Sequence, residues 1–129
     1  EKNGQGSGSQ STVRQVGSAL GIAVLGTVLF TGTQASLEQR LDELAVPSSQ
    51  ISIVSEAVVD SAGAAIPGLE AGLVAAQIEP GLAAEIKLAA GDAFTDGAKW
   101  AAWAAAGFLM LGFASTFRLT GRKQEEAKA

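Results

Sequence analysis

Few side chains in this sequence can do chemistry, and their types exclude most kinds of catalysis. The chain has no cysteine and no histidine, so the usual thiolate nucleophile, general base and imidazole metal ligand are missing. The glycine-rich start lacks the lysine of a phosphate-binding loop, and the carboxylates lack calcium-loop spacing. We therefore predict a protein that is not an enzyme, with no catalytic residue, no metal site and no cofactor.

Polar and small residues near the N-terminus share one face of a predicted helix. At about 100° per residue, this face carries Gln10, Arg14, Gly17 and Gly21, flanked by Gly6 and Val28. Glycines four residues apart let another helix approach closely, and a polar residue on such a face usually points into a bundle or a wet cavity. We interpret the face as packing against other helices or lining a passage. The alternative is that Arg14 extends to lipid headgroups and the glycines only pack a helix.

Two long uncharged stretches must position this face. No charge lies between Arg14 and Glu38, a gap of 23 residues, or between Lys99 and Arg118, a gap of 18. At about 1.5 Å per helical residue, either stretch can cross the hydrocarbon core of a bilayer. Trp100 and Trp103 stand at the start of the second stretch, where aromatic residues often mark the headgroup level. We interpret them as interface anchors, and ordinary packing residues are the alternative.

Between these stretches the pattern predicts short helices. Leu37, Leu41 and Leu44 recur at helical spacing, and Ser48 or Ser49 can cap a helix over roughly 50–65 that follows Pro47. A short apolar segment over 69–78 lies between two proline-glycine breaks, and a long helix is predicted from about 82 to 119. Asp92 and Asp96, near the second stretch, are expected to form a solvated helix face, with cation attraction as the alternative.

The fold class predicted from these segments is all-α, with two transmembrane helices joined by a long, partly helical extracytoplasmic loop. We expect a polar lead-in that begins the first membrane helix, the first span, the acidic loop, the second span and a basic cytoplasmic tail, at 1–12, 13–33, 34–97, 98–118 and 119–129.

Charge predicts the orientation of this hairpin. The segment from Ser36 to Gly97 carries ten acidic and two basic residues, whereas both terminal segments carry a small positive net charge. Because lysine and arginine favour the cytoplasmic side, we expect a multi-pass protein of the cell inner (plasma) membrane with both termini cytoplasmic. The acidic loop argues against nucleic acid as a partner. Since the chain starts at Glu1 within a Gly/Ser/Gln stretch, we also expect a fragment of a longer protein or a processed chain.

A family resemblance rests on the stretch GQGSGSQSTVRQVGSALGIAVLGTVL over 4–29. Its small-residue lead-in, Thr-x-Arg-Gln-x-Gly core and Leu-Gly-x-Ala-x-x-Gly-Thr continuation resemble the penultimate helix of major facilitator superfamily drug:proton antiporters with fourteen transmembrane helices. A weaker match, AFTDGAKWAAWAAAGFLML over 93–111, is similar to the entry into the last helix of that family. The loop from 36 to 90 matches no family pattern. The resemblance implies the C-terminal fragment of an exporter, its last two helices.

The resemblance implies a part of an integral membrane multidrug or small-molecule exporter that works by proton antiport and alternating access. Its partners would be the lipid bilayer, the remaining helices of the parent transporter and the parent's small-molecule substrate. Neither span contains a carboxylate, so the chain cannot by itself be the proton-coupling unit.

Three other interpretations remain open. The first is a stand-alone two-span membrane protein with an external interaction domain. The second is a secreted protein whose signal peptide spans about 14–35, with cleavage after Thr33-Gln34-Ala35. The third is a soluble helical domain.

Overall fold

The described part of the chain folds into four helices. A computed structural model describes the backbone of residues 3–126 and the side chains of residues 8–118. Along the chain the helices are α1 (Asn3–Glu43), α2 (Ser48–Asp60), α3 (Ile66–Ala75) and α4 (Pro80–Glu126). The described part of the chain contains no strand, which confirms the all-α fold class.

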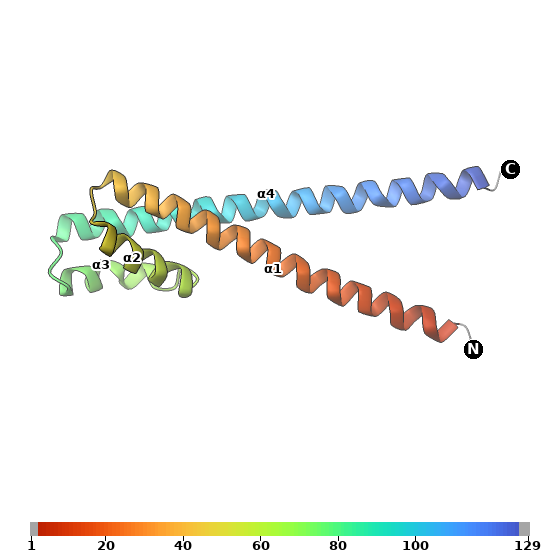
Figure 1. The fold of residues 1–129 in the computed structure, drawn as a ribbon, viewed down its shortest axis with the longest axis horizontal. Helices are drawn as coiled ribbons and strands as arrows, with labels where there is room; N and C mark the ends of the chain where they lie inside the picture. The colour runs from red at the N-terminus through yellow and green to blue at the C-terminus, as the bar shows by residue number, and fades with distance from the viewer. Residues whose placement is uncertain (1–2, 127–129) are drawn as a thin grey trace.

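The two long helices form a hairpin whose arms spread apart (Figure 1). α1 and α4 lie against each other near the turn end of the hairpin and diverge toward the termini, which lie at the same end of the molecule. The short helices lie at the turn end of the hairpin, where α2 packs on α1 and α3 packs on α4. We call residues 33–97 the cap, since they include both short helices and the adjoining ends of the long ones.

The cap has its own hydrophobic core. All four helices contribute buried apolar side chains to it. Fully buried are Leu37 and Leu41 of α1, Val58 of α2 and Ile86 of α4, and Leu73 of α3 packs with them. The predicted apolar face of residues 37–44 is therefore confirmed. Small residues of α4 (Ala83, Ala90 and Ala93) let the other helices approach it closely.

The predicted short helix around residues 37–44 is not a separate element. It is the last part of α1, because no proline or glycine interrupts the helix between Thr33 and Glu43. α1 ends before Pro47, where Ala45 takes a left-handed conformation (φ 56°) and the Val46 N–H bonds to the Leu41 carbonyl at 3.0 Å. This C-terminal motif buries Val46 in the core.

The boundaries of the short helices differ from those predicted. Neither Ser48 nor Ser49 caps α2: Pro47 holds the N-cap position, and no side chain there bonds the first turn. α2 ends at Asp60 and not near 65, since Ala62 and Gly63 both have positive φ. Pro67 does not precede α3 but lies in its first turn, where the missing N–H costs nothing. The long final helix is confirmed.

Both long helices are long and apolar enough to cross a membrane, over Gly8–Glu43 in α1 and Pro80–Arg118 in α4. Their most apolar windows are only 6% and 0% buried, so these side chains do not form the core of a soluble fold. Exposed apolar side chains cover both arms (Val16, Leu20 and Ile22 on α1; Phe108, Leu109, Met110, Leu111 and Phe113 on α4). Lipid or other helices must cover such a surface.

The predicted segment limits at 13–33 and 98–118 coincide with no break in α1 or α4, and they stay predictions. α1 already includes residues 3–12, and α4 extends through Glu126. Residues 1–2 and 127–129, which belong to the predicted lead-in and tail, lie outside the described residues.

Candidate functional site at the crossing of the long helices

α1 and α4 are in close contact at two glycines, Gly32 of α1 and Gly97 of α4. A Cβ placed on Gly97 would lie 2.6 Å from the Leu29 carbonyl oxygen and 2.9 Å from the Thr33 backbone nitrogen, and it would also clash with the Thr33 hydroxyl. A Cβ on Gly32 would lie 3.3 Å from the Gly97 Cα. Because the obstacles are mostly backbone atoms, only a residue without a side chain fits at Gly97 without moving a helix.

Thr33 closes this contact without leaving a polar group unpaired. Its side chain is fully buried, and its hydroxyl donates a hydrogen bond to the Leu29 carbonyl one turn earlier in α1, at 2.8 Å. The bond satisfies a hydroxyl that would otherwise be costly to bury. The crossing is therefore closely packed, and its buried hydroxyl is hydrogen-bonded within α1.

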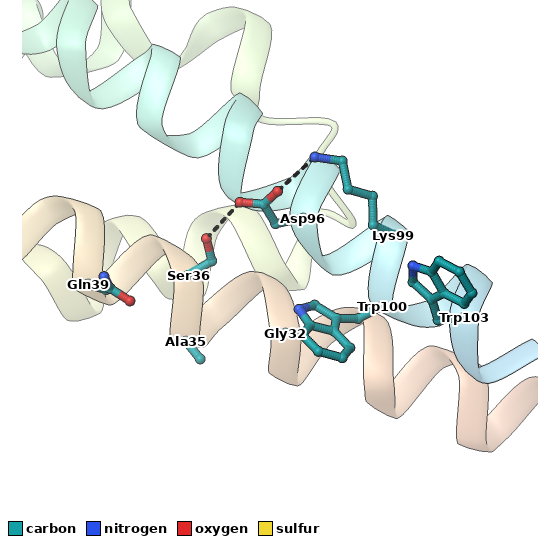
Figure 2. Close-up of a pocket in the computed structure, with 8 residues that line it drawn as sticks. All are labelled: Gly32, Ala35, Ser36, Gln39, Asp96, Lys99, Trp100 and Trp103. Atoms are coloured by element: carbon teal, nitrogen blue, oxygen red, sulfur yellow. Dashed lines mark hydrogen bonds and ion pairs between the residues drawn. The ribbon is translucent and has the colours of Figure 1, made fainter.

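A polar cluster joins the two helices just beyond the crossing, on the cap side. Arg40 of α1 donates through Nη2 to Asp96 Oδ2 at 2.8 Å and through Nη1 to Asp92 Oδ2 at 3.4 Å. Ser36 also donates to Asp96 Oδ2, at 3.3 Å, and Lys99 pairs with Asp96 Oδ1 at 3.0 Å. Figure 2 shows Ser36 and Lys99 on either side of the Asp96 carboxylate.

These contacts set the protonation state of Asp96. The hydrogen bond from Lys99, followed by that from Arg40, lowers the pKa of Asp96 below the ordinary carboxyl value of 3.8. Asp96 is therefore ionised at neutral pH, with two cations bound to it. Asp92 and Asp96 were expected to form a solvated face. Both side chains are at least partly exposed, and Arg40 of α1 forms an ion pair with each of them.

A cleft of about 750 Å³ opens beside the crossing, between α1 and the start of the apolar part of α4. Asp96, Lys99, Trp100 and Trp103 form its α4 wall, and Gly32 and Ser36 belong to its α1 wall. Figure 2 shows both indole rings on the cleft, with Trp100 beside Gly32. Trp100 and Trp103 are 65% and 75% exposed. No set of three acidic side chains in the described part of the chain is placed to hold a metal ion.

Comparisons with known proteins give one local similarity. The chain is 39% identical over 62 residues to the Multidrug resistance protein Stp of Mycobacterium tuberculosis, in two strains of that organism. The matched region is 48% of this chain but only 12% of the relative, so the chain spans a small part of that protein. No family model matches the chain, and no solved structure matches it.

The residues predicted to form the contact face do not meet at this site. Gln10, Arg14 and Gly17 are exposed on the outer arm of α1, and Gly21 is partly exposed. A Cβ on Gly17 or Gly21 would have no neighbour within 4 Å, so their helix-packing role stays a prediction. Trp100 and Trp103 lie where α4 leaves the cap, exposed as an interface anchor would be, and that role is likewise untested.

Sequence reasoning missed the residues that join the helices: Gly32, Thr33, Arg40 and Gly97. One signal for Arg40 was available, because it is one of only two basic residues in the acidic segment from Ser36 to Gly97. An isolated arginine in an acidic segment is expected to form ion pairs with carboxylates, and Asp92 and Asp96, four residues apart on one helix, were candidate partners. For Gly97, one glycine among 16, no comparable signal exists.

Proposed function

We propose that this chain is part of an integral membrane transporter, a multidrug or small-molecule exporter that works by proton antiport and alternating access. The observation that carries the proposal is the 39% identity over 62 residues to a multidrug resistance protein, combined with two long helices that expose their apolar surface. The resemblance to fourteen-helix antiporters of the major facilitator superfamily supplies the antiport mechanism.

The spread of α1 and α4 supports a place within a larger helical bundle. Beyond the crossing the arms separate toward the termini (Figure 1), so each leaves faces that other membrane helices can occupy. Gly17 and Gly21 have open space around them, which leaves room for a neighbouring helix. In alternating access, the face with Arg14, Gly17 and Gly21 would move against those neighbours, since small residues tolerate shifting contacts.

The proposal places the chain in the inner membrane with both termini in the cytoplasm. The acidic cap would then lie on the outer side, and the net positive charge near both ends of the hairpin supports this orientation. The parent's substrate would be a small molecule, and the partners of α1 and α4 would be lipid and the remaining helices.

Efflux measurements with the full product of the encoding gene test this proposal. Cells of a drug-sensitive host that express it should lose a preloaded cationic dye faster than control cells, and a protonophore should abolish the difference. Gly17→Leu or Gly21→Leu should reduce efflux strongly, because a large side chain blocks helix approach. Leu20→Ile is the matched control and should export normally. Dye retention equal to that of control cells would contradict the transport role, and equal activity of all variants would contradict the packing face.

One observation favours a second candidate, a stand-alone two-span membrane protein with an external interaction domain. The cap has a core of its own, to which all four helices contribute, so it does not need other segments to fold its apolar side chains inward. The gene distinguishes the candidates: a longer reading frame with many additional apolar spans selects the transporter, and a start codon just before Glu1 selects the two-span protein.

A further inference from the structure

The cleft beside the crossing contains a carboxylate whose two oxygens are already occupied. Asp96 Oδ1 accepts a hydrogen bond from Lys99, and Oδ2 accepts from Arg40 and Ser36. The Ser36 hydroxyl in turn accepts a hydrogen bond from Arg40 Nε at 3.3 Å. A cationic ligand at Asp96 would have to displace Lys99 or Arg40, so the lining of the cleft does not favour a cation.

Hydrogen-bond donors of α4, in contrast, remain available at the cleft. The Lys99 ammonium carries three N–H donors and uses one of them on Asp96, and its side chain is 65% exposed. The indole N–H groups of Trp100 and Trp103 bond to none of the described residues, although both side chains line the cleft (Figure 2). One cation and two neutral donors on one wall suit an anion with several acceptor oxygens.

The face of α4 that carries these donors continues into an open apolar stripe. Gly107 lies seven residues after Trp100, and Met110 lies seven after Trp103, so they share its side of the helix. A Cβ on Gly107 would have no neighbour within 4 Å, and Met110 and Leu111 are exposed. Leu111 is eleven residues after Trp100, or about 16 Å along the helix, which is close to half of the ~30 Å hydrocarbon core of a bilayer. The stripe therefore matches the depth of one leaflet.

We propose that the cleft binds the phosphate group of a phospholipid from the outer leaflet. Lys99 and the indole N–H groups of Trp100 and Trp103 donate to the phosphate oxygens, and the acyl chains lie along the stripe from Gly107 to Leu111. A soluble phosphate would meet only the donors, whereas a phospholipid also covers the apolar stripe that follows them, so the lipid is the better fit. This inference rests on the membrane placement in the proposed function, and it does not depend on export.

Native mass spectrometry of the full chain in detergent micelles, titrated with dioleoyl phosphatidylglycerol, tests the proposal. Saturation at one bound lipid per chain is expected. Lys99→Gln should weaken binding at least about tenfold, the factor that corresponds to a hydrogen bond between charged groups. Lys99→Arg keeps the charge and should restore most of the affinity.

Lys87→Gln is the matched control, because it removes a lysine of the cap that pairs with Glu70 and does not line the cleft. This variant should bind the lipid as the wild type does. An equal loss for Lys87→Gln and Lys99→Gln, or no saturation, would show diffuse attraction and overturn the site. The double variant Trp100→Phe/Trp103→Phe keeps aromatic rings but loses both N–H donors, so it should bind more weakly, and unchanged affinity would overturn the role of the indoles.

Two analogues separate the phosphate from the acyl chains. Dioleoylglycerol lacks the phosphate and glycerol 3-phosphate lacks the chains, so both should bind more weakly than the phospholipid. Equal binding of dioleoylglycerol would overturn the role of the phosphate, and equal binding of glycerol 3-phosphate would show a site for a soluble phosphate and overturn the lipid. Because binding is read on the chain itself, a failure here rejects the lipid site alone, and dye efflux separately decides the transport function.

Discussion

Replacing Gly97 by alanine should loosen the contact between α1 and α4. The added methyl group would lie 2.6 Å from the Leu29 carbonyl oxygen and 2.9 Å from the Thr33 backbone nitrogen. Backbone atoms cannot rotate away as a side chain can, so the helices must separate and the cap must adjust. Overpacking of this kind typically costs about 1–3 kcal/mol.

Gly91→Ala on the same helix is the matched control, because a Cβ there would have no neighbour within 4 Å. Both substitutions gain the same helix propensity, about 1 kcal/mol. The propensity gain cancels when the two variants are compared, and the overpacking cost remains. We therefore expect Gly97→Ala to be less stable than Gly91→Ala by about 1–3 kcal/mol, and the control to be at least as stable as the wild type.

Urea unfolding in detergent micelles, followed by tryptophan fluorescence, measures this difference. The chain has two tryptophans, Trp100 and Trp103, and both line the cleft beside the crossing, so their emission reports on separation of the helices. Equal stability of the two alanine variants would refute the inference that Gly97 packs against the backbone of Leu29 and Thr33 in the folded protein.

Three further outcomes are expected. Leu41→Ala should destabilise the cap by about 2–5 kcal/mol, because Leu41 is fully buried. Leu88→Ala, at an exposed position, should cost little stability. The same urea assay measures both variants, and equal effects would contradict the assigned core. A double-mutant cycle of Arg40→Gln and Asp96→Asn should show a favourable coupling that weakens as salt is added, and zero coupling at low salt would contradict the ion pair. Because the folded-state pKa of Asp96 is lowered, its contribution to stability should be complete above its ordinary pKa of 3.8 and lost as the pH falls through the lowered value. Asp96→Asn should therefore reduce the loss of stability in acid, measured by unfolding at a series of pH values, and an unchanged acid dependence would contradict the shift.

The long final helix could be predicted because it depends on local information: no proline interrupts the chain after Pro80. The spacing of Leu37, Leu41 and Leu44 indicated an amphipathic helix, and Leu37 and Leu41 are buried in the cap, but the continuity of this segment with the first span was not predicted. The predicted helix ends differ from the observed ones by a few residues. Ala45 and Ala62 end helices in a left-handed conformation, which the residue type alanine does not predict. Local patterns fix the face of a helix more reliably than its last residue.

The crossing could not be predicted in the same way. Arg40 and Asp96 are 56 residues apart in the chain, and they meet only because the cap folds the chain back on itself. Helical spacing shows which residues share a face but not which helix that face will contact. The same limit applies to Gly17 and Gly21, whose shared face follows from their spacing but around which the described chain leaves open space.

Labelling in intact cells tests most directly the central claim, that both apolar helices cross the membrane and hold the cap outside. The chain has no cysteine, so single cysteines can be introduced at Ser49 in the cap and at Ser11 near the N-terminus, both exposed positions. A membrane-impermeant maleimide should label Ser49→Cys in intact cells and Ser11→Cys only after the cells are broken. Labelling of Ser11→Cys in intact cells, or of neither variant until the cells are broken, would contradict the claim.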